Sequence, residues 1–96
     1  MVTLEMLRTN REAIHAIAAR HGASNLRVFG SVARGDTNAD SDVDVLIDLD
    51  DGRSLFDLIA VKLDLEDLFG CKVDVGTARS LKPRIADRVL REALPL

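Results

Sequence analysis

The sequence predicts an α/β (α+β) domain in which helices pack on a small mixed β-sheet. Segments with helical and strand-like periodicity follow one another in the order helix, strand, strand, helix, strand, helix. Apolar residues make up 47% of the chain, which is enough to build a core. The length of 96 residues suits one small domain, and neither repeats nor a linker divide it. We therefore expect residues 1–96 to form a single domain.

The chain opens with a helix that we predict over residues 3–21. One stripe of this helix is apolar and consists of Leu4, Leu7, Ile14 and Ala18. Gly22 follows where a left-handed C-cap residue belongs. Residues 26–29 then read as a short strand, because they are rich in apolar and β-favouring side chains.

Two strands and two helices follow in the rest of the chain. We predict them over residues 43–49 (strand), 54–69 (helix), 71–75 (strand) and 80–93 (helix). Asp50-Asp51-Gly52 forms the turn between the first two of these elements. Ser80 suits the N-cap of the last helix, and Pro83 is tolerated in its first turn.

The junction between the strand at 26–29 and a helical turn at 31–34 is the first candidate site. Gly30 allows the backbone to approach a ligand closely because it has no Cβ atom. Ser31 begins a helical turn whose free N–H groups and positive dipole end favour an anion. We therefore predict that Gly30 and Ser31 bind phosphate.

Two carboxylates at the start of the strand at 43–49 form the second candidate site. Asp42 and Asp44 lie two residues apart, so both side chains leave the same face of the strand. Their Cα atoms are expected to lie roughly 7 Å apart. Carboxylate oxygens that converge from such positions suit a hard divalent cation such as Mg²⁺. The same stretch fails the residue pattern of both a P-loop and an EF-hand.

Taken together, these residues resemble the signature of a known family. The pattern Gly30-Ser31, Arg34-Gly35-Asp36, Ser41-Asp42-Val43-Asp44-Val45-Leu46 looks like that of the minimal nucleotidyltransferases, the MNT-type members of the DNA polymerase β superfamily. The resemblance extends to Lys72-Val73-Asp74-Val75, where the family carries its third carboxylate, and to residues 80–85, which are similar to its closing helix. It covers the chain from about residue 26 to the C-terminus and implies a polymerase β-like nucleotidyltransferase fold.

The resemblance also implies a reaction in which a hydroxyl attacks the α-phosphorus of ATP and pyrophosphate leaves. In this interpretation Asp42, Asp44 and Asp74 are the catalytic residues and the ligands of two metal ions, either Mg²⁺ or Mn²⁺. Asp74 is also the candidate for accepting the proton of the attacking hydroxyl.

Three residues are the candidates for binding the nucleotide. Ser31, with the N–H groups that follow Gly30, would hold the β- and γ-phosphates. Arg34 would neutralise phosphate charge, or it would instead form an ion pair with Asp36 or Asp40 in the following loop. The sequence leaves both interpretations of Arg34 open.

The chain contains the candidate catalytic residues but little surface that could recognise an acceptor. Because MNT-type proteins are commonly paired with a HEPN-domain protein, a helical ribonuclease toxin, the resemblance implies an antitoxin that moves AMP from ATP to a tyrosine of that toxin. The chain has no tyrosine and so cannot modify itself at one. Two alternatives stay open: neutralisation of the partner by occlusion alone, or transfer to an aminoglycoside-like small molecule in an acidic pocket supplied by a second subunit.

Composition narrows the possible partners further. The net charge of −3 and the pI near 5.2 disfavour broad non-specific binding to nucleic acid. Aromatic residues are scarce, so side chains on which the bases of single-stranded nucleic acid could stack are not evident. The one cysteine, Cys71, excludes an internal disulfide and a cysteine-based zinc site. Because the sequence has neither a signal peptide nor a long apolar run, we expect a soluble cytoplasmic protein with no membrane contact.

The helix predicted at 54–69 carries apolar side chains over an arc of roughly 240°. They form two stripes: Leu55, Phe56, Ile59 and Leu63 in one, and Leu58, Val61, Leu65 and Leu68 in the other. One stripe should face the sheet, which leaves the other for a neighbour. We predict that the stripe of Leu58, Val61, Leu65 and Leu68 contacts the partner protein. The alternative is that the first or the last helix covers it.

The last helix carries Arg84, Arg88 and Arg91 at spacings of four and three residues, which forms a basic stripe. Such a stripe is either a solvated face or a docking surface for an acidic partner or for RNA. The sequence alone does not separate these interpretations.

Overall fold

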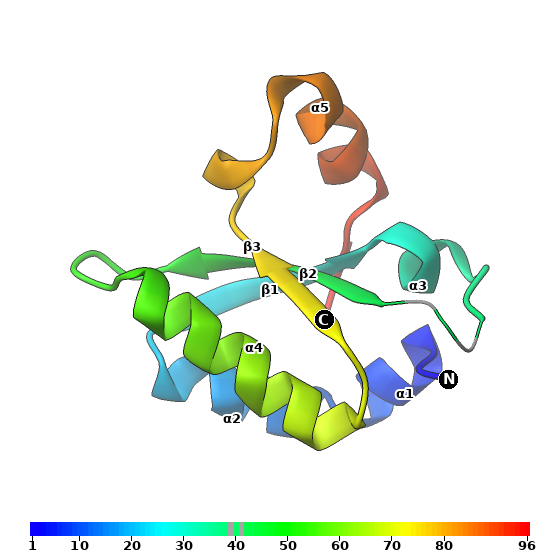
Figure 1. Cartoon of the computed structure of the whole chain (residues 1–96), viewed down its shortest axis with the longest axis horizontal. Coiled ribbons are helices and arrows are strands. Elements are labelled where there is room, and N and C mark those ends of the chain that lie inside the picture. Colours follow the sequence, from blue (N-terminus) through cyan, green and yellow to red (C-terminus); the bar gives the residue numbers. More distant parts are fainter. Residues whose placement is uncertain (39, 41) are drawn as a thin grey trace.

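The computed structural model describes residues 1–38, 40 and 42–96, and in this part of the chain the strands form one mixed sheet (Figure 1). The strands are β1 (Ala23–Phe29), β2 (Val43–Leu49), β3 (Val73–Gly76) and β4 (Leu94–Pro95). Their order is β3-β2-β1-β4. β1 is antiparallel to both β2 and β4, whereas β2 and β3 are parallel. This mixed sheet with helices on it confirms the predicted fold class.

The helices lie on both sides of the sheet. They are α1 (Leu4–Thr9), α2 (Arg11–Arg20), α3 (Gly30–Arg34), α4 (Leu55–Phe69), η1 (Ala78–Ser80) and α5 (Pro83–Glu92). Figure 1 shows α1, α2 and α4 on one side, which we call the core face, and η1 and α5 on the other, which we call the site face. Within the described residues, no helix is both long and apolar enough to cross a membrane.

Strand β2 shows how the two faces differ. Val43, Val45 and Ile47 are buried in the main apolar cluster on the core face. The residues between them alternate to the site face, because successive side chains of a strand point to opposite sides. Those residues are Asp44 and Leu46, and Asp48 continues the same alternation after Ile47. Leu46 is fully buried but lies outside the main cluster, so the site face has a small apolar centre of its own.

The helix predicted at 3–21 is interrupted at Asn10. This residue ends α1 and precedes α2, and its side-chain Nδ2 donates a hydrogen bond of 2.8 Å to the carbonyl oxygen of Met6. A short polar side chain that competes for backbone partners is a common cause of a helix end. The predicted apolar stripe is confirmed, since Leu7, Ile14 and Ala18 are buried.

Helix α4 corrects our prediction of the partner surface. The stripe assigned to the partner consists of Leu58, Val61, Leu65 and Leu68. Val61 and Leu65 are instead fully buried, and Leu58 packs against the main cluster; only Leu68 is exposed. The physical reason is that α4 connects the parallel strands β2 and β3, and a crossover helix turns its more continuous apolar face to the sheet.

Two smaller predictions also change, and one strand was not predicted. β1 begins at Ala23, and its register shifts between Ser24 and Arg27, where Asn25 has a left-handed φ of 50°. Ser80 does not cap the last helix, because it ends the separate turn η1 and its hydroxyl donates to the carbonyl of Thr77. The two-residue strand β4 was not predicted, since so short a segment has no periodicity to detect.

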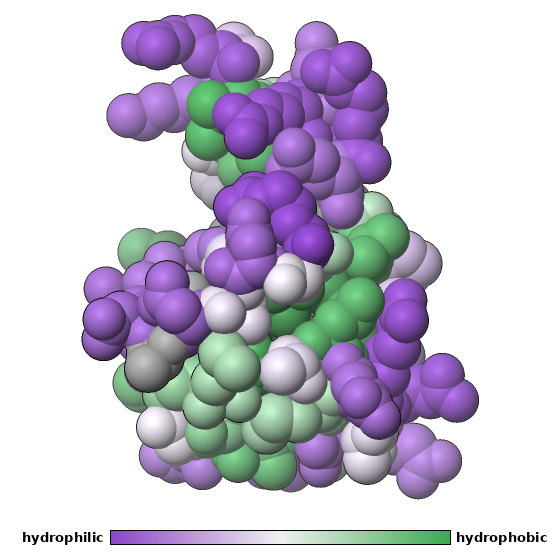
Figure 2. All heavy atoms as spheres, turned by 90° about the vertical axis from the view of Figure 1, so that its right-hand side faces the viewer, coloured by the Kyte–Doolittle hydropathy of each residue, from purple (hydrophilic) through white to green (hydrophobic). Residues whose placement is uncertain are grey.

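Helix α5 rises from the site face of the sheet, and Figure 2 shows strongly hydrophilic residues gathered on the upper part of the molecule. Its basic stripe is partly tied to the helix itself. Arg88 pairs with Glu92 at 3.3 Å, and Nε of Arg91 donates to the carbonyl oxygen of Asp87. These contacts favour the interpretation of a solvated face.

Candidate functional site

Gly30 is where the chain leaves β1 and enters α3, and its conformation requires glycine. Its φ of 71° is left-handed, which side chains with a Cβ atom rarely adopt. A Cβ atom at this position would also overlap the carboxylate oxygen Oδ2 of Asp44. The turn and the carboxylate are therefore in direct contact.

The pairing of the strands brings two of the predicted carboxylates together. Asp44 in β2 is in register with Asp74 in β3 and with Phe29 in β1. Neighbouring strands lie about 4.8 Å apart, so Asp44 and Asp74 leave the site face side by side. Asp42 precedes β2 by one residue, and its Oδ2 lies 3.8 Å from the Nζ atom of Lys72. Ser41, the motif residue before it, lies outside the described residues.

The electrostatics of Asp44 show that the three carboxylates interact. Partial burial raises the pKa of Asp44 above its ordinary value, and the charges of Asp74 and Asp42 raise it further. The positive charge of Arg34 acts in the opposite direction. A carboxylate that is costly to ionise beside two others gains most from a cation placed between them.

The donor set suits a hard divalent cation, because all three side chains offer carboxylate oxygens. Among the described residues, however, no group of three or more acidic, histidine or cysteine side chains is already arranged around one metal position. Asp42, Asp44 and Asp74 therefore fit a metal by their chemistry and their placement on one edge of the site face.

Arg34 ends α3 and makes two ion pairs. Its Nε atom lies 3.1 Å from Oδ2 of Asp36, and its Nη1 atom lies 3.6 Å from Oε2 of Glu92 at the end of α5. The structure thus shows the loop ion pair with Asp36 that was one of the two interpretations of this residue. The side chain is 43% exposed and close enough to Asp44 to affect its pKa, so it also borders the carboxylates.

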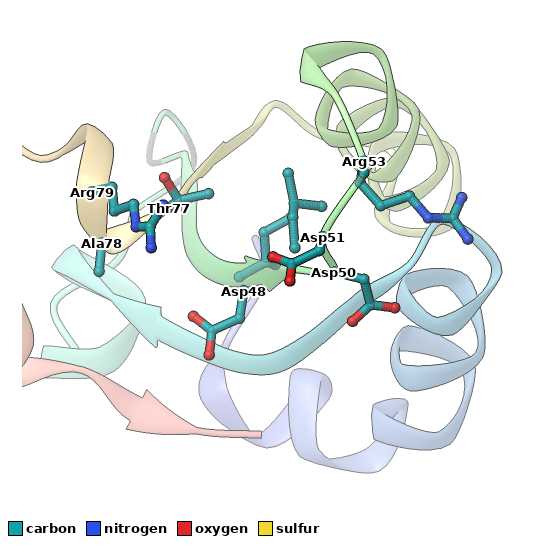
Figure 3. Close-up of a pocket in the computed structure, with 10 residues that line it drawn as sticks. Asp48, Asp50, Asp51, Arg53, Thr77, Ala78 and Arg79 are labelled. Atoms are coloured by element: carbon teal, nitrogen blue, oxygen red, sulfur yellow. The ribbon is translucent and has the colours of Figure 1, made fainter.

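A cavity of about 490 Å³ lies beyond the other end of β2. It is lined by Ile47, Asp48, Leu49, Asp50, Asp51, Gly52, Arg53, Thr77, Ala78 and Arg79. Figure 3 shows Thr77, Ala78 and Arg79 on one side of it and Asp50 and Asp51 on the other. Asp48 also forms an ion pair of 2.8 Å with Arg27. The lining of the cavity therefore carries three carboxylates and two guanidinium groups, those of Asp48, Asp50, Asp51, Arg53 and Arg79.

Sequence reasoning missed this cavity, although one signal for it was present. Asp44 and Asp48 both belong to the alternate positions of β2 that leave the site face. Four residues separate them, which corresponds to about 13 Å along a strand. The remainder of the lining comes from the loop at 50–53 and from η1, whose meeting depends on the tertiary fold.

Comparisons with known proteins agree with this geometry. The sequence profile of the nucleotidyltransferase domain matches residues 11–96. The protein adenylyltransferase MntA of Thermococcus cleftensis is 40% identical over 95 residues, which cover 98% of this chain and 96% of that protein. A proposed protein adenylyltransferase of Methanocaldococcus jannaschii is 39% identical over 84 residues, covering 88% of this chain and 90% of that protein.

Solved structures show the same fold. A proposed minimal nucleotidyltransferase superposes with a TM-score of 0.86 at 52% identity, over 99% of this chain and 97% of that one. A chain from a toxin–antitoxin complex with AMP-PNP superposes with a TM-score of 0.74, over 90% of this chain and 71% of that one. Its identity is only 18%, so this second likeness concerns the fold alone.

Proposed function

This chain belongs to the nucleotidyltransferase domain family, and from that premise we propose that it transfers AMP from ATP to a tyrosine hydroxyl of a partner HEPN-domain toxin. By this transfer it acts as an antitoxin in the cytoplasm, where ATP is available. The observation that carries the proposal is the contact of Gly30 with Asp44, which joins a phosphate-binding turn to a carboxylate site. Relatives named protein adenylyltransferases, similar over nearly the whole chain, support a protein as the acceptor.

In the proposed reaction the hydroxyl oxygen of the acceptor forms a bond to the α-phosphorus of ATP. The bond from that phosphorus to the oxygen bridging to the β-phosphate breaks, and pyrophosphate leaves. Asp74 accepts the proton of the hydroxyl. Asp42, Asp44 and Asp74 would hold two divalent metal ions, which supply neutralisation of phosphate charge when bound.

The turn after β1 positions the leaving group in this scheme. Backbone N–H groups after Gly30 and the hydroxyl of Ser31 hold the β- and γ-phosphates. Arg34 is shared between Asp36 and Glu92, and phosphate oxygens compete for the same guanidinium. The departure of Arg34 from Asp36 would then accompany ATP binding.

The acceptor belongs to another molecule. No tyrosine occurs in the sequence, so any tyrosine modified by this chain is on a partner. The toxin–antitoxin complex among the structures of the same fold is consistent with such a partner. We therefore place the acceptor tyrosine on the protein encoded beside this chain.

A transfer assay tests the proposal. The chain is incubated with ATP labelled at its α-phosphate, Mg²⁺ and the protein encoded beside it. We expect label on the partner with the wild-type chain and none with the double variant Asp42→Asn/Asp44→Asn. Asp64→Asn is the matched control, because it removes a carboxylate from α4, where Asp64 pairs with His21 at 2.8 Å, on the core face. This control should transfer normally.

Two results would contradict the proposal in different ways. A stable complex that never acquires label would favour neutralisation by occlusion. Label transferred by the Asp42→Asn/Asp44→Asn variant at the wild-type rate would show that these carboxylates are not the catalytic residues.

A second candidate function is favoured by the three aspartates that line the cavity on the site face. Asp48, Asp50 and Asp51 line it within this single chain, so a cationic hydroxyl compound of the aminoglycoside class would need no second subunit for recognition. The same assay separates the two functions, because this candidate predicts labelled small molecule in the absence of any protein acceptor.

A further inference from the structure

Helix α4 presents an apolar face to solvent. Leu55 is 68% exposed, Phe56 is 82% exposed, and Ile59 and Leu63 are also exposed. We call these four residues the outer stripe. Phe56, Ile59 and Leu63 are spaced three and four residues apart, and Leu55 precedes Ile59 by four, so all of them lie along one side of the helix.

The outer stripe is exposed because the opposite apolar face of the helix is the one that packs in the core. Val61 and Leu65 fill the core under the sheet, and the outer stripe points away from them. Apolar surface left exposed to water is unfavourable relative to apolar surface that is buried. Phe56 is the most exposed of the large apolar residues described, and aromatic residues of this kind are the usual anchors of protein interfaces.

The surroundings of the outer stripe are acidic. Between residues 50 and 67 the chain has six acidic residues and only two basic ones. Both basic residues are neutralised within this segment, Lys62 by Glu66 at 3.0 Å and Arg53 by Asp57 at 3.4 Å. Asp64 pairs with His21 on the core face, so Asp50, Asp51 and Asp67 carry the net negative charge that this segment leaves near the stripe. An interface with a second copy would place these negative charges against one another.

The stripe also adjoins the cavity on the site face. Leu55 and Phe56 follow directly after the loop at 50–53, and Asp50, Asp51 and Arg53 of that loop line the cavity. Figure 3 shows this loop between the cavity and the start of α4. The cavity continues to Asp48, on the same face of β2 as Asp44. One surface therefore runs from the outer stripe around the end of β2 toward the carboxylates.

We propose that the outer stripe of α4 is the docking surface for the acceptor protein, and that this partner presents an apolar patch bordered by lysine or arginine. The inference rests on the proposed function, since it assigns a place on this chain to the protein that receives AMP. A partner seated on Leu55 and Phe56 lies against the acidic loop at 50–53. Its basic border matches that loop, and its acceptor segment reaches the site face through the cavity.

A binding experiment with the protein encoded beside this chain, the proposed acceptor, tests the docking surface. The double variant Phe56→Ser/Leu63→Ser should weaken the Kd at least about thirtyfold, because two exposed interface anchors are lost. The matched control is Ile85→Ser/Leu90→Ser, which removes two similarly exposed apolar side chains from α5. Its Kd should stay within about threefold of wild type. Both variants should keep the wild-type Tm, which shows that the fold is intact.

A charge-reversal variant gives an independent test of the docking surface. Asp67 lies one turn beyond Leu63 and is exposed. The Asp67→Lys variant should slow association several-fold at low salt, and the difference should shrink at high salt. In the transfer assay, Phe56→Ser/Leu63→Ser should raise KM for the partner and leave kcat nearly unchanged.

Several outcomes would overturn the docking surface. These are an unchanged Kd for Phe56→Ser/Leu63→Ser, a wild-type chain that does not bind this probe, and a wild-type dimer that the same variant dissociates. The last result would mean that a second copy covers the stripe. Loss of binding in this variant, together with no label on the partner in the wild-type reaction, would reject the transfer reaction but keep the docking surface. Label on the partner in the wild-type reaction, together with an unchanged Kd for Phe56→Ser/Leu63→Ser, would keep the transfer reaction and reject the docking surface.

Discussion

The two faces of β2 differ in what they contribute to the molecule. The core face stabilises the fold, whereas the site face brings charged side chains together. On the core face, Val43, Val45 and Ile47 are buried together with α1, α2 and α4. On the site face, burial and two neighbouring carboxylates raise the pKa of Asp44. Adjacent residues of one strand thus contribute in opposite directions to the free energy of unfolding. The comparison shows how so small a domain tolerates a cluster of like charges.

The largest effect that would test this comparison is expected from Asp44→Asn. Transfer should fall at least about a hundredfold, since one of the three carboxylates is lost. The Tm without metal should stay the same or rise, because burial and like charges disfavour the ionised carboxylate. Thermal unfolding beside the transfer assay measures both effects. A clear fall in Tm would mean that the site face stabilises the fold after all.

The complementary change on the core face is Ile47→Ala. Ile47 is fully buried, so its truncation should cost about 2–5 kcal/mol of the free energy of unfolding. Urea denaturation measures this loss. The transfer rate of the folded fraction should remain close to wild type, and a rate as low as that of Asp44→Asn would show that the two faces are not separable.

A third test concerns the turn between the two regions. Gly30→Ala combines the strain of a left-handed residue with overlap onto Asp44, so we expect transfer to fall at least about tenfold. Gly70→Ala is the matched control, because Gly70 also has a left-handed φ but has open space where its Cβ would lie. Both variants should lose about 1–2 kcal/mol of stability, and only Gly30→Ala should lose transfer. Equal activity in the two would contradict the role of the contact.

The smallest effect is expected at Glu66, which joins α4 to β3. Its Oε2 atom accepts hydrogen bonds from the backbone N–H of Val73 at 3.1 Å and from Nζ of Lys62 at 3.0 Å. These contacts, first of all the one from Val73, lower the pKa of Glu66 in the folded state. Its stabilising contribution is therefore present above the pKa of an unfolded glutamate, about 4.3, and is lost as the pH falls through the folded value.

The Glu66→Gln variant should accordingly melt below wild type at neutral pH, with the difference closing in acid. Melting curves from pH 7 to pH 3 measure it. A gap that is constant over this range would mean that Glu66 acts by packing and not by its charge.

The sequence predicted the elements whose pattern is local. The strand with Asp42 and Asp44 at its start, the turn at Gly30 and the two apolar stripes of α4 all follow from spacing within one segment. The choice between the two stripes was wrong, because it depends on how a crossover helix meets the sheet. Burial of Leu46 on the site face and the pairing of β4 with β1 also depend on segments distant in sequence.

The candidate site residues were likewise predictable where their signal is local in the sequence. The contact of Gly30 with Asp44 is consistent with the motif, which places both near one strand pair. The ion pair of Arg34 with Asp36 is local and was one of the two interpretations, whereas its contact with Glu92 joins α3 to α5 and has no local signal. The cavity at the far end of β2 needs the loop at 50–53 and η1 together, so no single motif predicts it.

The register of β2 has a consequence for the order of folding. Asp44 pairs with Phe29 in a nearby antiparallel strand, but it pairs with Asp74 across a parallel connection that includes all of α4. Closing the longer connection costs more chain entropy, and parallel pairings form slowly. We therefore expect a nascent chain to bring Asp44 against Gly30 early and to gain Asp74 only after α4 has docked. Mutually repelling charges would then come together only once the apolar core is in place to hold them.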